Sequence, residues 1–132
     1  MQTVLAVVAR EPEACWRAFT DASTFSAWIP GLRRARVIQV GADGLPVEIL
    51  FEFGESRTYS LVYTYDLAQR EVRWEPRANK RDAVAGFARF DAFDDGTRVT
   101  YGLANHSGAT RLDELTELVA AFGAWMAAAT RR

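Results

Sequence analysis

The chain has few side chains that could move a proton or hold a charged group. His106, the only histidine, lies in LANHSGATR and is a candidate acid or base near neutral pH. Arg57 opens a tyrosine-rich segment and alternates in step with Tyr59, so an inward guanidinium could fix a carboxylate there. Each also has a simpler interpretation, as a loop histidine, a surface ion pair or a β-forming tyrosine. Catalytic residues are therefore left unassigned, with His106, Arg57 and Tyr59 as candidates.

Other kinds of site are not expected. One histidine and one distant cysteine, Cys15, do not supply the ligands of a zinc site. A single cysteine excludes an intrachain disulfide and is compatible with a reducing cytosol, so we expect a cytoplasmic protein. The sequence contains no glycine-rich phosphate loop and no Gly-x-Ser-x-Gly motif. We expect neither a metal nor a cofactor.

The bulk composition predicts one folded domain, residues 1–132. Hydrophobic residues make up 49% and charged residues 25%, which is typical of a packed core. The net charge of −1 argues against a nucleic-acid partner, although Arg33, Arg34 and Arg36 could form a local patch or a solvated strand edge. No run of about 18 apolar residues occurs, so no integral membrane segment is expected.

The elements that must position these side chains begin with a strand and two short helices. Residues 3–9 are rich in β-branched residues and predict the strand. Pro12 suits the first turn of a helix, and a second short helix carries Phe25 and Trp28. Pro30–Gly31 ends that helix and turns the chain.

Six further strands and a long helix follow. Residue types alternate within each strand segment, and Asp95–Gly96 is a hairpin signal. The segments are 34–41, 47–53, 57–67, 70–76, 83–93 and 97–105. Residues 111–132 have helical spacing with a broad apolar stripe. The order predicts an α+β fold in which a seven-stranded curved antiparallel sheet grips the C-terminal helix, with the first strand at an edge beside the last.

A cavity follows from this arrangement, because one helix across a curled sheet cannot fill the space at both ends. Tyr59, Tyr63 and Tyr65 alternate on one strand, and their hydroxyls are hard to satisfy in a dry core. The alternative is that this face meets solvent. The predicted cavity residues are Trp28, Phe51, Phe53, Tyr59, Leu61, Tyr63, Tyr65, Trp74, Phe90, Tyr101, Leu103, Leu118, Phe122 and Trp125.

Two local patterns resemble a known superfamily. They are Asp21…Trp28-x-Pro30–Gly31 and the hairpin Asp95-Gly96-Thr97-Arg98-Val99. Together with the element order, they resemble the START / polyketide cyclase–dehydrase / lipid-transport (SRPBCC) superfamily over essentially the whole chain. The resemblance implies a helix-grip fold, a cavity between sheet and long helix, and an entrance near the Pro-Gly segment. It carries over no catalytic motif.

Three functions remain open on this basis. The first is binding or transport of a small hydrophobic or amphipathic ligand, such as a lipid, a quinone or a polyketide-like molecule. The second is a polyketide cyclase or dehydratase type of enzyme that uses tyrosine, arginine or histidine groups in the cavity. The third is a ribosome-associated or other protein-interaction factor, supported only by the arginine patch. The sequence identifies neither the ligand nor whether the protein is a monomer or a homodimer.

Overall fold

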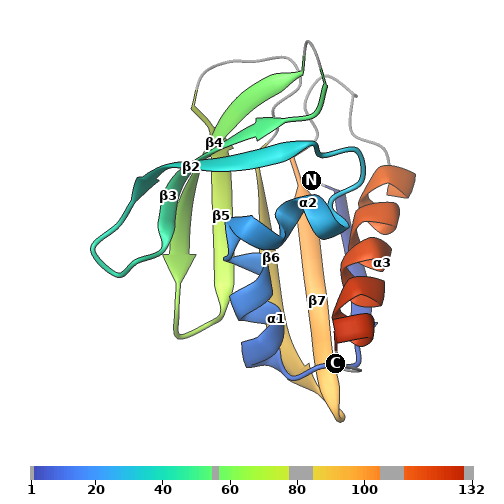
Figure 1. The fold of residues 1–132 in the computed structure, drawn as a ribbon. Helices are drawn as coiled ribbons and strands as arrows, with labels where there is room; N and C mark the ends of the chain where they lie inside the picture. Colours follow the sequence, from blue (N-terminus) through green and yellow to red (C-terminus); the bar gives the residue numbers. More distant parts are fainter. Residues whose placement is uncertain (1, 55–56, 78–84, 105–111, 130–132) are drawn as a thin grey trace.

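Within the described residues, one antiparallel sheet is covered on its concave face by helices in the computed structural model (Figure 1). The structure describes residues 2–54, 57–77, 85–104 and 112–129. The strands are β1 (Gln2–Val8), β2 (Arg34–Val40), β3 (Pro46–Glu52), β4 (Thr58–Asp66), β5 (Glu71–Pro76), β6 (Gly86–Phe93) and β7 (Gly96–Leu103). The helices are α1 (Pro12–Phe19), a 3-10 turn (Ala22–Thr24), α2 (Phe25–Trp28) and α3 (Leu112–Ala129).

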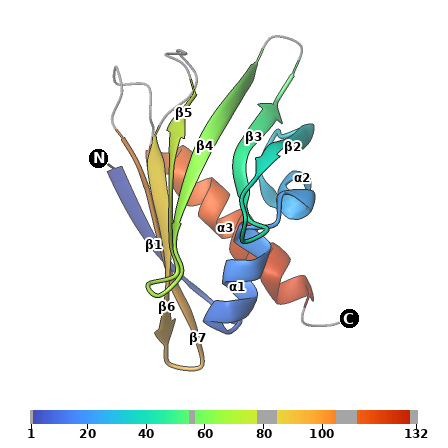
Figure 2. The same ribbon diagram turned by 90° about the vertical axis from the view of Figure 1, so that its left-hand side faces the viewer.

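The sheet order is β1-β7-β6-β5-β4-β3-β2, which confirms the predicted meander with the first strand beside the last. Each strand from β2 to β7 pairs with its neighbour in sequence, because short turns favour antiparallel pairing. Figure 2 shows β2 and β3 bending away from β6 and β7, so that the helices lie inside the bend. This curvature creates the hollow in which the candidate site lies.

Local chemistry explains the short helices. Pro12 occupies the first helical position of α1, where a missing N–H costs nothing, and Glu13 lies at the positive helix end. The Asp21 carboxylate accepts a hydrogen bond from the Ser23 N–H at 3.0 Å and starts the 3-10 turn. Gly31 has a φ of 79°, a conformation that favours glycine, and this lets the chain reverse from α2 into the sheet.

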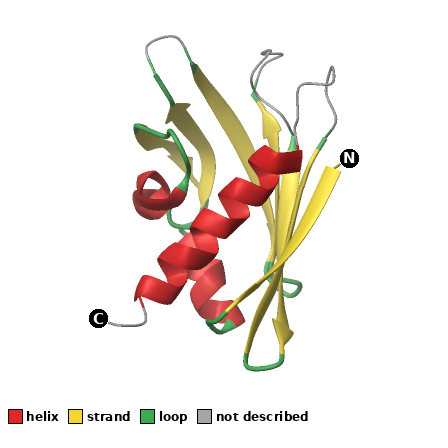
Figure 3. Cartoon of the chain, turned by 90° about the vertical axis from the view of Figure 1, so that its right-hand side faces the viewer, coloured by secondary structure: helices red, strands yellow, loops and turns green. Residues whose placement is uncertain are grey.

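α3 lies diagonally across the concave face and buries its apolar stripe there (Figure 3). Leu115, Val119, Phe122 and Met126 are all buried, which confirms the predicted amphipathic face. The Arg10 guanidinium donates to the Met126 carbonyl at 3.2 Å. That carbonyl lies in the last turn of the described helix, so this contact holds the helix end against the turn after β1.

A few element boundaries differ from the predictions. The first strand ends at Val8 rather than at residue 9, because the chain already turns there toward Pro12. The sixth strand begins at Gly86, and the part of its predicted range before residue 85 lies outside the described residues. The long helix is described from Leu112 to Ala129. No helix among the described residues is long and apolar enough to cross a membrane.

Candidate ligand-binding cavity

A cavity of about 650 Å³ lies between the concave face of the sheet and the first half of α3. α2 and the Pro30–Gly31 turn border it, where the sequence predicts an entrance. The residues that line it are Phe19, Phe25, Trp28, Ile29, Pro30, Gly31, Phe51, Phe53, Arg57, Tyr59, Leu61, Tyr63, Trp74, Tyr101, Leu103, Glu114, Leu115, Glu117 and Leu118. Its size is within the range of small-molecule pockets.

One wall is a row of stacked aromatic rings. Phe51 on β3 is paired with Tyr59 on β4, and their ring centroids lie 5.9 Å apart. Phe25 of α2 stacks on Phe51 at 6.0 Å, with the two ring planes only 9° apart. Phe53 extends the row, 5.7 Å from the Tyr59 ring. The row presents flat aromatic faces, which suits a planar ligand.

The deeper wall is built around Trp74 of β5. Its ring lies 5.9 Å from the Tyr63 ring and 5.5 Å from the Tyr101 ring. Gly86 on the neighbouring strand makes room for this indole, because a Cβ there would lie 2.8 Å from Trp74 Cζ2. The absence of a side chain at Gly86 therefore lets the Trp74 indole keep its observed position.

Two phenols bring unsatisfied polar groups into this apolar space. Tyr63 and Tyr101 are 8% and 7% exposed, and within the described chain neither hydroxyl has a hydrogen-bond partner. Burial raises the pKa of the Tyr63 phenol well above 10, and burial also raises the pKa of Tyr101. Both therefore stay neutral at physiological pH. They can donate hydrogen bonds to a carbonyl or hydroxyl oxygen.

The cavity mouth carries charge. Arg57 lines it, with its guanidinium 4.9 Å from the centre of the Phe53 ring and open to solvent. Glu114 and Glu117 of α3 line the cavity as well, and both are exposed. Two acidic residues of the sheet, Glu52 and Asp91, pair with Arg34 and Arg89 rather than with Arg57.

The cavity floor is an aromatic cluster. Phe19, the last residue of α1, lies 5.3 Å from the Trp28 ring, and Trp28 lies 4.7 Å from Phe122. The Trp28 indole N–H donates to the Thr24 hydroxyl at 3.1 Å, which fixes the ring orientation. Trp28 therefore serves both as packing for α2 and as part of the lining.

Two predicted lining residues from the sheet lie elsewhere. Tyr65 stands beyond the cavity on β4, where its hydroxyl donates to the Pro46 carbonyl at 2.6 Å and its ring meets Trp16 edge-on. Phe90 is 5.2 Å from the Phe19 ring and contacts Phe122, so it is packed beneath the floor. Both side chains are on the concave side of the sheet, but α1 covers them.

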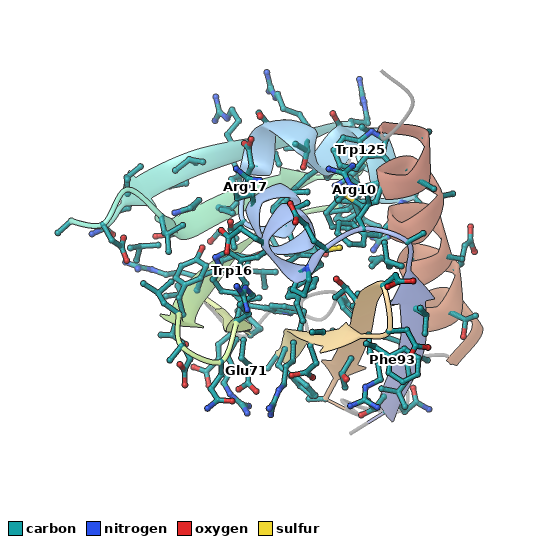
Figure 4. The ribbon with its side chains drawn as sticks, turned by 90° about the horizontal axis from the view of Figure 1, so that it is seen from below. Arg10, Trp16, Arg17, Glu71, Phe93 and Trp125 are labelled. Carbon is teal, nitrogen blue, oxygen red and sulfur yellow. The ribbon has the colours of Figure 1, made fainter. Side chains whose placement is uncertain are left out.

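Two predicted lining residues from the long helix also lie outside. Phe122 is fully buried under Trp28 and closes the cavity from below. Trp125 lies one turn further along α3, near Arg10 and away from the lining residues Glu114 to Leu118 (Figure 4). The cavity uses only the first half of α3, because the second half packs against the core and β1.

The predicted lining omits Phe19, Phe25, Ile29, Glu114, Leu115 and Glu117, all of which line the cavity. Phe19 and Leu115 have core spacing on their helices, and nothing in the sequence shows that their tips reach a void. His106 lies in residues 105–111, outside the described part of the chain. Among the described residues, no group of three or more His, Cys, Asp or Glu side chains is placed to hold a metal ion.

The arginine segment is a solvated strand edge. Arg34 makes two hydrogen bonds with the Glu52 carboxylate, at 2.9 and 3.0 Å, and Arg36 lies 3.7 Å from the same group. These interactions lower the pKa of Glu52, chiefly through the Arg34 hydrogen bond. The Glu52 carboxylate thus offsets part of the positive charge of Arg34 and Arg36. This argues against the arginine segment as a binding patch for a protein partner.

Comparison with known proteins locates the fold among solved structures only. No protein-family model and no curated protein sequence matches the chain. A START superfamily protein from Mycobacterium smegmatis has a TM-score of 0.78 at 14% identity, covering 95% of each chain. The di-domain ARO/CYC StfQ from the steffimycin biosynthetic pathway has a TM-score of 0.80 at 15% identity, over 100% of this chain and 46% of that one. The Zhui aromatase/cyclase from Streptomyces sp. R1128 has a TM-score of 0.65 at 15% identity, over 98% and 87%.

These likenesses establish the fold. The chain has a START-like helix-grip fold, and the predicted α+β class is confirmed.

Proposed function

We propose that the chain binds a flat, largely apolar molecule that carries at least one carbonyl or hydroxyl oxygen, such as a polyketide-like or quinone-like compound. The observation that supports this most directly is the pair of buried, unpartnered phenols, Tyr63 and Tyr101, on either side of Trp74 in an aromatic cavity. Neither hydroxyl is among the fully enclosed polar atoms that lack a partner, so each reaches the cavity space, where a ligand oxygen can accept its hydrogen bond.

The expected affinity follows from area and hydrogen bonds. Burying about 200 Å² of apolar ligand surface contributes about 5 kcal/mol before ordering costs. Hydrogen bonds from the phenols add about 0.5–1.5 kcal/mol each. Together these terms contribute about 6–8 kcal/mol before ordering costs, so the dissociation constant of a small three-ring ketone should be no lower than about 1 µM.

The test is calorimetric titration with 9-fluorenone, a planar ketone. The blocked variant is Leu61→Trp, which fills the cavity from β4, and the control is Leu67→Trp at an exposed leucine outside the lining. We expect the wild type and Leu67→Trp to bind alike and Leu61→Trp to bind at least tenfold more weakly, with all three folded by circular dichroism. Equal binding by Leu61→Trp would place the ligand elsewhere and refute the proposal.

A second candidate function is a cyclase type of reaction, in view of the fold shared with the ARO/CYC protein StfQ and the Zhui aromatase/cyclase. The observation in its favour is that Arg57 and Tyr59 line the same cavity as the two phenols. Such groups could hold a poly-carbonyl chain in a folded pose and polarise one carbonyl. The test is incubation with a synthetic poly-β-ketone thioester, followed by mass spectrometry. Cyclisation no faster than in buffer would leave binding as the function.

A further inference from the structure

The free edge of β1 is an apolar surface that the rest of the described chain leaves open. β1 is the outermost strand and pairs with β7 on one side only. Leu5 and Val7 are 65% and 62% exposed, more than any other large hydrophobic residue described. Figure 3 looks onto this edge, and α3 packs against the inner face of β1 while leaving its outer edge uncovered. An open edge of this kind is a template for pairing with another strand.

One hydrogen bond fixes the direction of the backbone groups in β7. The Ala104 N–H donates to the Ala85 carbonyl at 2.8 Å, in line with the β6–β7 register. Because these groups alternate in direction along a strand, the even-numbered residues of β7 bond to β6. The odd-numbered residues of β7 therefore bond to β1.

The same alternation decides which groups of β1 face outward. Tyr101 of β7 is paired with Val4, so the even-numbered residues of β1 bond to β7. The N–H and C=O groups of Thr3, Leu5 and Val7 then point away from the sheet. Within the described chain these groups have no partner.

The opposite edge of the sheet is protected and this one is not. β2 carries Arg34 and Arg36, and its register shifts twice between Val37 and Val40. Charged residues and bulges of this kind oppose edge pairing. β1 has no charged residue, no proline and no register shift from Gln2 to Val8.

We propose that two copies of the chain pair antiparallel through β1, about a twofold axis at Leu5. Leu5 then faces Leu5 of the second copy, and Thr3 faces Val7. All three pairs are of the hydrogen-bonded type, which exchanges two backbone bonds per pair. The edge is self-complementary. In this one register, every outward N–H and C=O group of Thr3, Leu5 and Val7 makes a hydrogen bond with the second copy, and the apolar side chains lie side by side. This symmetry identifies a second copy as the occupant.

The pairing is compatible with the candidate site. No residue of β1 lines the cavity, and the cavity mouth lies near α2 and β4. β1 is already held extended by β7 and by α3 on its inner face, so little order is lost when it pairs.

The first test is sedimentation equilibrium from about 5 to 200 µM, with Leu5→Lys and a matched control, Leu67→Lys, at a similarly exposed leucine. Leu5→Lys places two like charges directly opposite each other across the axis. We expect the wild type and Leu67→Lys to dimerise, and Leu5→Lys to raise the dimer dissociation constant at least about tenfold. A monomeric wild type, or a Leu5→Lys variant that dimerises like Leu67→Lys, would overturn the proposal.

The second test checks the register and does not depend on one variant. Val7→Glu places a carboxylate opposite Thr3 of the second copy and is expected to weaken the dimer. Adding Thr3→Lys gives each carboxylate a cation across the interface, and we expect the double variant to regain most of the lost affinity. Within one copy these positions are four residues apart on an extended strand, too far to pair with each other. Failure of the double variant to recover would reject this register.

Discussion

Replacing Tyr63 or Tyr101 by phenylalanine separates a ligand-binding role of these phenols from a structural one. The substitution removes one hydroxyl and leaves the ring contacts with Trp74 in place. Neither hydroxyl has a partner within the described chain, so no intramolecular hydrogen bond is lost.

The expected effect on stability is small. Each hydroxyl reaches the cavity space and makes no hydrogen bond within the described chain, so its removal should change the free energy of unfolding by less than about 1 kcal/mol. Tyr65→Phe is the matched control, because its hydroxyl donates to the Pro46 carbonyl at 2.6 Å. We expect Tyr65→Phe to lower the free energy of unfolding by about 1 kcal/mol.

For binding, we expect Tyr63→Phe and Tyr101→Phe to have an effect and Tyr65→Phe to have none. Tyr63→Phe and Tyr101→Phe should each weaken 9-fluorenone binding about 2- to 12-fold, the value of one hydrogen bond. Binding of fluorene, which lacks the carbonyl, should not change in either variant. Tyr65→Phe should bind both compounds like the wild type, because Tyr65 does not line the cavity.

Urea unfolding and calorimetric titration of the three variants provide the measurements. The reasoning is refuted if Tyr63→Phe and Tyr101→Phe each lose 2 kcal/mol or more of stability, since the hydroxyls would then have structural partners. It is also refuted if these two variants bind fluorene and 9-fluorenone more weakly than the wild type by the same factor.

Three further predictions concern the mouth, the deep wall and the pH dependence. Arg57→Gln should weaken binding of 9-fluorenone-2-carboxylate about two- to fivefold by titration and leave 9-fluorenone unaffected, since the exposed guanidinium acts on charge alone; equal losses would argue against this role. Gly86→Ala should cost about 1–3 kcal/mol in urea unfolding and weaken 9-fluorenone binding, because the new methyl group meets the Gly102 carbonyl and Trp74. The free energy of unfolding should fall from about pH 8 upward as the unfolded chain releases the Cys15 thiol proton, and fall further above about pH 10 as it releases its phenolic protons. In the double variant Tyr63→Phe/Tyr101→Phe, the free energy of unfolding should fall less steeply with pH, by up to about 1.4 kcal/mol per pH unit for each tyrosine removed. An unchanged slope would contradict the raised pKa of these two phenols.

Much of the fold could be predicted because its signals are local. The alternation in VEILFEF and RTYSLVYTYDL correctly identifies which face of β3 and β4 is buried, and the Asp95–Gly96 turn marks the last hairpin. The stripe on α3 predicts its buried face for the same reason.

The extent of the cavity could not be predicted, because it depends on where helices cross the sheet. Tyr63 and Tyr65 share one face of β4, but only Tyr63 reaches the cavity, since α1 covers the strand at Tyr65. Phe122 and Leu115 share one face of α3, and only Leu115 lies beside the void. Alternation reports which way a side chain points. It does not report how far along the element the packing partner lies.

The most direct test of the proposed function is a crystal structure of the protein with 9-fluorenone. We expect the tricyclic ring to lie between the Phe51 row and Trp74, with its carbonyl oxygen within hydrogen-bonding distance of the Tyr63 or Tyr101 hydroxyl. A ligand bound only on the outer face of the sheet, or an empty cavity at saturating ligand concentration, would refute the proposed function.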